Sequence, residues 1–155
     1  MHAKIEIGGY LVEFDRKATA ACYAQISVSG PEACGCAHCR NWVAGRDDSI
    51  TSEFRRLLDR LGIPSNCEIE VSEMPGRGQT KPHVYCGWYL FIGRIVSGKE
   101  FHEFPCDHIQ LSFAARRSFL VPVFEGREAC ELHFATEVNE DLSAEEYMAP
   151  PKPKR

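Results

Sequence analysis

Three cysteines lie within six residues of this chain, at Cys34, Cys36 and Cys39, in the pattern C-x-C-x-x-C. Core packing does not explain such close spacing, because the residues between them are two small ones and a histidine. One tight turn can present several thiolates to a metal ion at about 2.3 Å, the usual zinc–sulfur distance. The pattern therefore predicts a metal-binding loop over residues 34–39, with zinc as the first candidate and an iron–sulfur cluster as the alternative.

The loop needs a fourth donor, because a structural zinc site usually has four Cys or His ligands. Cys22 lies upstream, on a segment that we expect to be a strand. Cys106 and His108 are two residues apart, so on a strand their side chains would face the same way. These three residues are the candidates for the fourth ligand. A water molecule or a substrate in that position would instead make the site catalytic.

The other cysteines are not expected to form disulfides, although the chain of 155 residues contains 8 cysteines. The N-terminal residues lack the apolar run of an export signal, so we expect a cytoplasmic protein with reduced thiols. No stretch is apolar for the about 18 residues that a membrane helix needs, so we expect no membrane partner. The formal net charge of -4 gives no overall attraction to nucleic acid.

Alternating and β-branched segments predict a mainly antiparallel sheet. The expected strands are residues 3–7, 10–15, 19–28, 67–72, 84–96, 109–113, 119–124 and 130–138. The pair Gly8-Gly9 between the first two strands is typical of a hairpin. Alternation predicts that Val71 is buried and that Glu68 and Glu131 face solvent.

Residues 50–61 carry the clearest helical signal. Their apolar residues recur at i, i+3, i+4 and i+7 from Phe54 to Leu61, and Gly62 ends the helix. A short helix over Arg40–Ala44 also fits the sequence. Since the helices come together after the third strand, without a βαβα alternation, the predicted class is α+β: a mainly antiparallel sheet with one or two helices following the Cys-rich loop.

The length of the chain suits a single domain. We expect one α+β domain over residues 1–140, which includes the zinc-binding loop. Residues 141–155 are acidic and then rich in Pro and Lys, so they are expected to form a flexible tail. The polar, Gly-rich and Pro-rich residues 73–82 are expected to form a mobile loop.

The cysteine motif and a later strand together resemble a group of small bacterial proteins whose function is unassigned. Cys34 to Trp42 reads C-G-C-A-H-C-R-N-W, and Tyr85 to Gly93 reads Y-C-G-W-Y-L-F-I-G. The group shares a C-x-C-x-x-C-R-N-aromatic motif and a Y-G-G-W-Y-like strand, and the similarity spans most of the chain. Cys86 stands where the group's pattern has Gly, so we do not expect it to be a ligand.

A second cluster of titratable residues runs from His102 through Cys106 to His108 in the pattern H-x3-C-x-H. It can bind a metal, act in acid–base chemistry or complete the first site, but such clusters are also common on ordinary surfaces. A cysteine paired with the distant His83 or His133 is a further candidate for nucleophilic catalysis.

We expect a zinc-stabilised domain that binds an unknown protein partner and displays Arg40, Asn41 and Trp42 from the loop. The first alternative is a small metal-dependent enzyme with an open zinc position and a Glu or His as acid or base. The second is a nucleic-acid-binding module with a basic helix face. That face comprises Arg40, Arg46, Arg55, Arg56 and Arg60. Pairing of these arginines with neighbouring acids is the competing explanation, and the negative net charge favours it.

Overall fold

Seven strands and four α-helices make up the described part of the chain, which in this computed structural model comprises residues 2–74, 83–117 and 121–138. The strands are β1 (Ala3–Ile7), β2 (Tyr10–Phe14), β3 (Glu70–Glu73), β4 (His83–Ser97), β5 (Phe104–Cys106), β6 (Ile109–Ala115) and β7 (Ala129–Val138). The helices are α1 (Arg16–Tyr23), α2 (Gly30–Cys34), α3 (Ala37–Ser49) and α4 (Ser52–Leu61), with a 3₁₀ helix, η1, at Pro122–Phe124.

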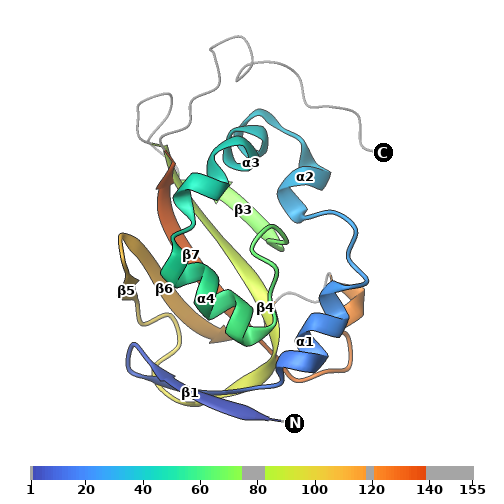
Figure 1. Ribbon diagram of the computed structural model, residues 1–155, viewed down its shortest axis with the longest axis vertical. Helices are drawn as coiled ribbons and strands as arrows, with labels where there is room; N and C mark the ends of the chain where they lie inside the picture. The colour runs from blue at the N-terminus through green and yellow to red at the C-terminus, as the bar shows by residue number, and fades with distance from the viewer. Residues whose placement is uncertain (1, 75–82, 118–120, 139–155) are drawn as a thin grey trace.

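All strand pairs are antiparallel, in the order β1-β2-β4-β7-β6-β5, and β3 also pairs with β4 (Figure 1). The predicted α+β class with a mainly antiparallel sheet is confirmed. Among the described helices, none is long and apolar enough to cross a membrane.

The main core lies between one face of the sheet and helices α3 and α4, which Figure 1 shows lying across that face. Trp42 of α3 stacks on Phe134 of β7 with ring centroids 5.3 Å apart. Phe54 of α4 meets the edge of Tyr89 of β4 at 6.2 Å. The apolar stripe predicted for α4 is confirmed, because Phe54, Leu57, Leu58 and Leu61 are all buried. Aromatic packing therefore holds α3, which carries the cysteine loop at its start.

One side of β4 pairs with β7, and the other side is completed in part by a helix. On that other side, the N-terminal half of β4 pairs with β3 and the C-terminal half pairs with β2, and between them β4 meets α1. The Tyr23 hydroxyl donates to the Leu90 carbonyl at 2.7 Å and accepts from the Leu90 N–H at 3.0 Å. The Thr19 hydroxyl oxygen accepts from the Ile92 N–H at 2.9 Å. Side chains of α1 thus satisfy backbone groups that a neighbouring strand would otherwise pair.

The strand predicted over residues 19–28 is wrong, because α1 ends only at Tyr23. The carboxylate of Asp15 caps this helix by accepting from the Ala18 N–H at 2.9 Å. Thr19 and Tyr23 are a β-branched and an aromatic residue, which favour strands on average. Four residues apart on a helix, they face the same side and reach β4 together.

Other differences concern boundaries and burial. The strand expected at 67–72 begins at Glu70, and Glu68 is buried at 1% exposure instead of facing solvent. Glu131 of β7 is likewise buried, at 3%. Within the strand expected at 119–124, the described residues Pro122–Phe124 form η1. The loop expected to be mobile extends into residues 75–82 and the expected tail covers 141–155, and both ranges lie outside the described residues.

Replacing Tyr23 with Phe should lower the free energy of unfolding by about 1–3 kcal/mol, because the buried N–H and C=O of Leu90 would both lose a partner. Urea denaturation followed by circular dichroism measures this loss. Tyr10→Phe is the matched control, since the Tyr10 hydroxyl donates to a single carbonyl, that of His102, in a part-buried position. Equal losses in the two variants would contradict the role of Tyr23 at the sheet edge.

Candidate metal centre

The three predicted cysteines come together where α2 meets α3. Cys34 is the last residue of α2, Cys36 is the N-cap of α3, and Cys39 lies in the first turn of α3. Gly35 joins the helices with a φ of 65°, a left-handed conformation that favours glycine. The three Sγ atoms lie within 4.8 Å of one another. The sequence spacing therefore produces a group of thiols that can hold one metal ion.

The three sulfur atoms have different surroundings. The Cys36 Sγ accepts from the Cys39 N–H at 3.5 Å and lies at the N-terminal end of α3. Cys39 is buried, whereas Cys34 is exposed. Burial raises the pKa of the Cys39 thiol, and the neighbouring Cys36 and Cys34 raise it further. A metal ion that binds here would displace the proton of Cys39, since the thiolate is the ligand.

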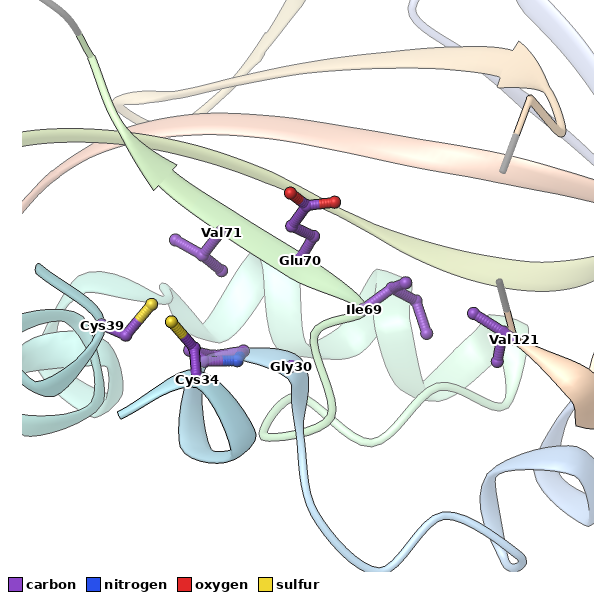
Figure 2. Close-up of a pocket in the computed structure, with 8 residues that line it drawn as sticks. Gly30, Cys34, Cys39, Ile69, Glu70, Val71 and Val121 are labelled. Atoms are coloured by element: carbon purple, nitrogen blue, oxygen red, sulfur yellow. The ribbon is translucent and has the colours of Figure 1, made fainter. Parts of the chain in front are cut away.

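A pocket of about 260 Å³ opens beside two of these sulfurs. Figure 2 shows the sulfurs of Cys34 and Cys39 facing each other below β3. Val71 of β3 contributes to the wall, and Glu70 points its carboxylate to the opposite side of the strand (Figure 2). An ion held by the cysteines would therefore lie next to a cavity.

None of the three candidates for the fourth ligand joins this group. The Cys22 Sγ donates to the Val123 carbonyl at 3.4 Å, in the packing between α1 and η1. Cys106 is buried in β5, where burial raises its thiol pKa to about 11, and His108 is exposed in the following turn. All cysteines and histidines of the sequence fall within the described residues. The group therefore contains three thiols and, within those residues, no fourth Cys or His.

The second cluster predicted in the sequence does not form a metal site in the described part of the chain. Cys106, His102 and His108 are not brought together as a group of ligand atoms close enough to share an ion. The Tyr10 hydroxyl instead donates to the backbone carbonyl of His102 at 2.8 Å, and the His102 side chain is exposed.

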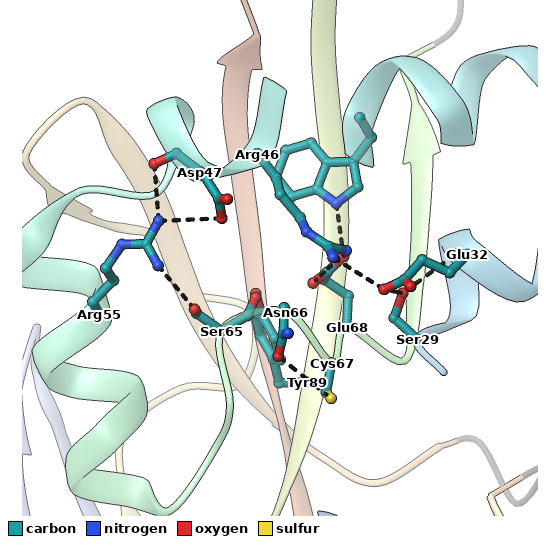
Figure 3. A network of polar contacts seen from close by, with 11 residues as sticks. Ser29, Glu32, Arg46, Asp47, Arg55, Ser65, Asn66, Cys67, Glu68 and Tyr89 are labelled. Carbon is teal, nitrogen blue, oxygen red and sulfur yellow. Dashed lines mark hydrogen bonds and ion pairs between the residues drawn. The ribbon is translucent and has the colours of Figure 1, made fainter. Parts of the chain in front are cut away.

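A buried ion pair holds the two cysteine-bearing helices in place (Figure 3). The Glu68 carboxylate accepts from the Trp42 indole N–H at 2.8 Å and from the Arg46 guanidinium at 3.1 Å. The same guanidinium donates to Glu32 of α2 at 3.0 Å, and the Ser29 hydroxyl donates to that carboxylate at 2.9 Å. This network links α2, α3 and the segment before β3 through contacts that need no metal.

A second carboxylate lies close to the centre. Glu73 shares a face of β3 with Val71, its side chain is 7% exposed, and it pairs with both His38 and His83. The Nδ1 atom of His83 lies 2.6 Å from the Glu73 carboxylate. His38 stands between two of the cysteines, and its backbone carbonyl accepts from the Tyr85 hydroxyl at 2.9 Å. Glu73 thus pairs with a histidine that directly precedes Cys39 in the chain and whose side chain is 53% exposed. The alternation of β3 is the one sequence signal that points to Glu73.

Two of the three residues expected to be displayed by the loop are not displayed. Trp42 and Asn41 are both buried at 0% exposure. The Asn41 amide donates to the Tyr85 hydroxyl at 3.1 Å, and Arg40 donates to the Gly35 carbonyl at 2.8 Å. The sequence interpretation of Trp42 and Asn41 as displayed residues is therefore wrong, because α3 packs against the sheet through them, whereas Arg40 is half-buried.

Comparison of the chain with known protein families, with curated proteins and with solved structures returned no match. The chemical interpretation of the site therefore rests on its geometry.

Replacing Arg46 with Met should lower the free energy of unfolding by about 3–5 kcal/mol, because the fully buried Glu68 carboxylate would lose its counter-charge. Arg55→Met is the matched control, since Arg55 pairs with the exposed Asp47 and should cost at most about 1 kcal/mol. Both arginines appear in Figure 3. Chemical denaturation of the two variants measures the difference, and similar losses would argue against a special role for the buried pair.

Proposed function

We propose that this protein is a small zinc-dependent enzyme. In this proposal Cys34, Cys36 and Cys39 hold the ion and leave one coordination position for a water molecule or a substrate. The observation that carries the proposal is a group of three thiols beside a pocket, a group that no fourth Cys or His of the described residues joins. Three protein ligands and an open position are typical of catalytic zinc, whereas structural zinc is closed by four.

The short span of the ligands argues against a mainly structural ion. All three lie within residues 34–39, so a metal ion would close a small loop and connect no distant segments. The core that holds α3 is built from Trp42, Phe134 and the ion pair with Glu68, and none of these contacts includes a cysteine. The ion is therefore better suited to chemistry than to holding the sheet together.

The neighbouring Glu73–His38 pair supports a catalytic role. Zinc polarises an oxygen ligand or lowers the pKa of bound water, and such chemistry needs a group that accepts and returns a proton. His38 pairs with a carboxylate that is mostly buried and also contacts His83, so its ring is oriented. A carboxylate that orients a histidine is a common arrangement for proton transfer. We assign proton transfer to His38 and its positioning to Glu73.

The two other candidate functions, protein binding and nucleic-acid binding, depend on residues that are largely buried or engaged in contacts within the chain. The protein-binding prediction relied on Trp42 and Asn41, which are buried. The nucleic-acid prediction relied on five arginines, of which three make internal contacts. These are Arg40 with Gly35, Arg46 with Glu32 and Glu68, and Arg55 with Asp47 and Ser65. Both functions remain predictions without support from the site.

Purified protein should contain about one zinc ion per chain by elemental analysis, since one ion satisfies the three thiolates. Each of the substitutions Cys34→Ser, Cys36→Ser and Cys39→Ser should abolish zinc binding. Cys67→Ser should retain the zinc, because Cys67 is a half-buried thiol outside the group. Cys22→Ser and Cys106→Ser should also retain the metal. Metal-free wild-type protein, or loss of zinc in Cys106→Ser, would contradict the proposed ligand set.

Removal of the ion by a chelator should leave the sheet folded and loosen only the turn that joins α2 to α3 and the first turn of α3. The reason is that the aromatic core and the Arg46–Glu68 pair do not include the metal. Hydrogen exchange before and after chelation measures this effect, with faster exchange expected near residues 34–40. Cooperative unfolding of β4 and β7 on chelation would identify the ion as structural and refute the enzymatic proposal.

A further inference from the structure

The residues that line the pocket beside the cysteines favour some classes of ligand over others. This preference does not depend on which metal ion is bound. Its walls come from α2, through Gly30 and Pro31, from the β3 segment, through Ile69 and Val71, and from Val121. These groups are aliphatic or small, and no aromatic ring lines the pocket in the described residues. A flat nucleobase would find no ring on which to stack, since base recognition commonly uses aromatic side chains.

The charges around the pocket disfavour anionic ligands. Three thiolates and a divalent ion carry one net negative charge. Glu70 is the one charged residue of the described lining, and it adds no positive charge. Arg40, which directly follows Cys39 in α3, donates to the Gly35 carbonyl. A carboxylate or phosphate would therefore enter an apolar, negatively charged site without a counter-ion, which is costly.

The size of the pocket favours a small ligand. Its volume of about 260 Å³ is below the about 300–1,000 Å³ of sites that hold drug-sized molecules. Gly30 packs tightly against this wall, because a Cβ atom there would lie 1.9 Å from the Ile69 carbonyl oxygen. The Gly30 N–H also donates to the Glu68 carbonyl at 2.9 Å. The wall between α2 and β3 is thus closely packed and leaves little room for expansion.

We propose that this pocket binds a small, uncharged aliphatic carbonyl compound, such as an amide or an ester, whose carbonyl oxygen takes the open position on the metal. The aliphatic tail would lie against Val71, Ile69 and Val121. Because the compound needs an ion for its head group, the inference rests on the proposed zinc centre. It goes beyond that proposal by naming the class of substrate.

The test uses the full-length protein loaded with Co²⁺ in place of Zn²⁺, since the visible spectrum of cobalt reports its ligands. The probes are acetamide, propionamide and butyramide, which are uncharged and carry the proposed carbonyl head group. Each should change the cobalt spectrum, and affinity should rise about fourfold with each added methylene that becomes buried. Succinamate, an amide as long as butyramide that ends in a carboxylate, should bind at least about tenfold more weakly than butyramide, because its charge would be desolvated without a partner.

A substitution in the pocket tests the role of its lining without changing the metal ligands. Val121→Phe, at a half-buried position, should fill the pocket and remove the dependence on chain length, while the cobalt spectrum without probe stays unchanged. Val96→Phe is the matched control, because Val96 is 43% exposed on β4 and does not line the pocket.

The outcomes distinguish the two proposals. If Co²⁺ binds but no amide changes its spectrum, or if the charged probe binds as well as the neutral one, the substrate class is wrong and the metal site stands. If Co²⁺ itself does not bind to the wild-type protein, the zinc centre and the substrate class both fail.

Discussion

The buried carboxylate of Glu68 is the contact on which the geometry around the cysteines depends. Its side chain is fully buried, and its charge is balanced by Arg46, which is itself only 10% exposed. Burying either the Glu68 carboxylate or the Arg46 guanidinium without the other would cost several kcal/mol of desolvation free energy, about 3–5 kcal/mol, so each group requires the other. Because Arg46 also binds Glu32, one guanidinium joins two helices and the segment that leads into β3. The position of the three thiols thus follows from contacts that contain no cysteine.

Features encoded within a few neighbouring residues were predicted well from the sequence. The Gly8-Gly9 hairpin, the apolar stripe of α4 and the group of three thiols all depend on spacings shorter than about three helical turns. The long strand β4 and the last strand β7 were also found, because their β-branched and aromatic residues have no competing helical pattern.

Features that depend on distant partners were missed. Alternation placed Glu68 on the solvent side, but its partners Trp42 and Arg46 lie 26 and 22 residues away in the chain. Thr19 and Tyr23 suggested a strand, although they reach the edge of β4 from a helix, about 70 residues away in sequence. The fourth ligand was sought by residue type alone, and residue type cannot tell that Cys22 packs against η1. In each case the decisive contact is tertiary.

Because the fold is held by contacts that include no cysteine, the proposed zinc centre could leave one coordination position open. A zinc ion that must hold a fold together needs four protein ligands from segments that would otherwise part. Here the Trp42–Phe134 stack and the ion pair with Glu68 already hold α3 against the sheet. A metal ion bound by residues 34–39 would not be needed to hold the fold together, so the ligand in one of its coordination positions can exchange without disrupting the core. In the proposed enzyme, the aliphatic pocket selects which molecule approaches that position, and His38, which directly precedes Cys39 in the chain, is paired with Glu73.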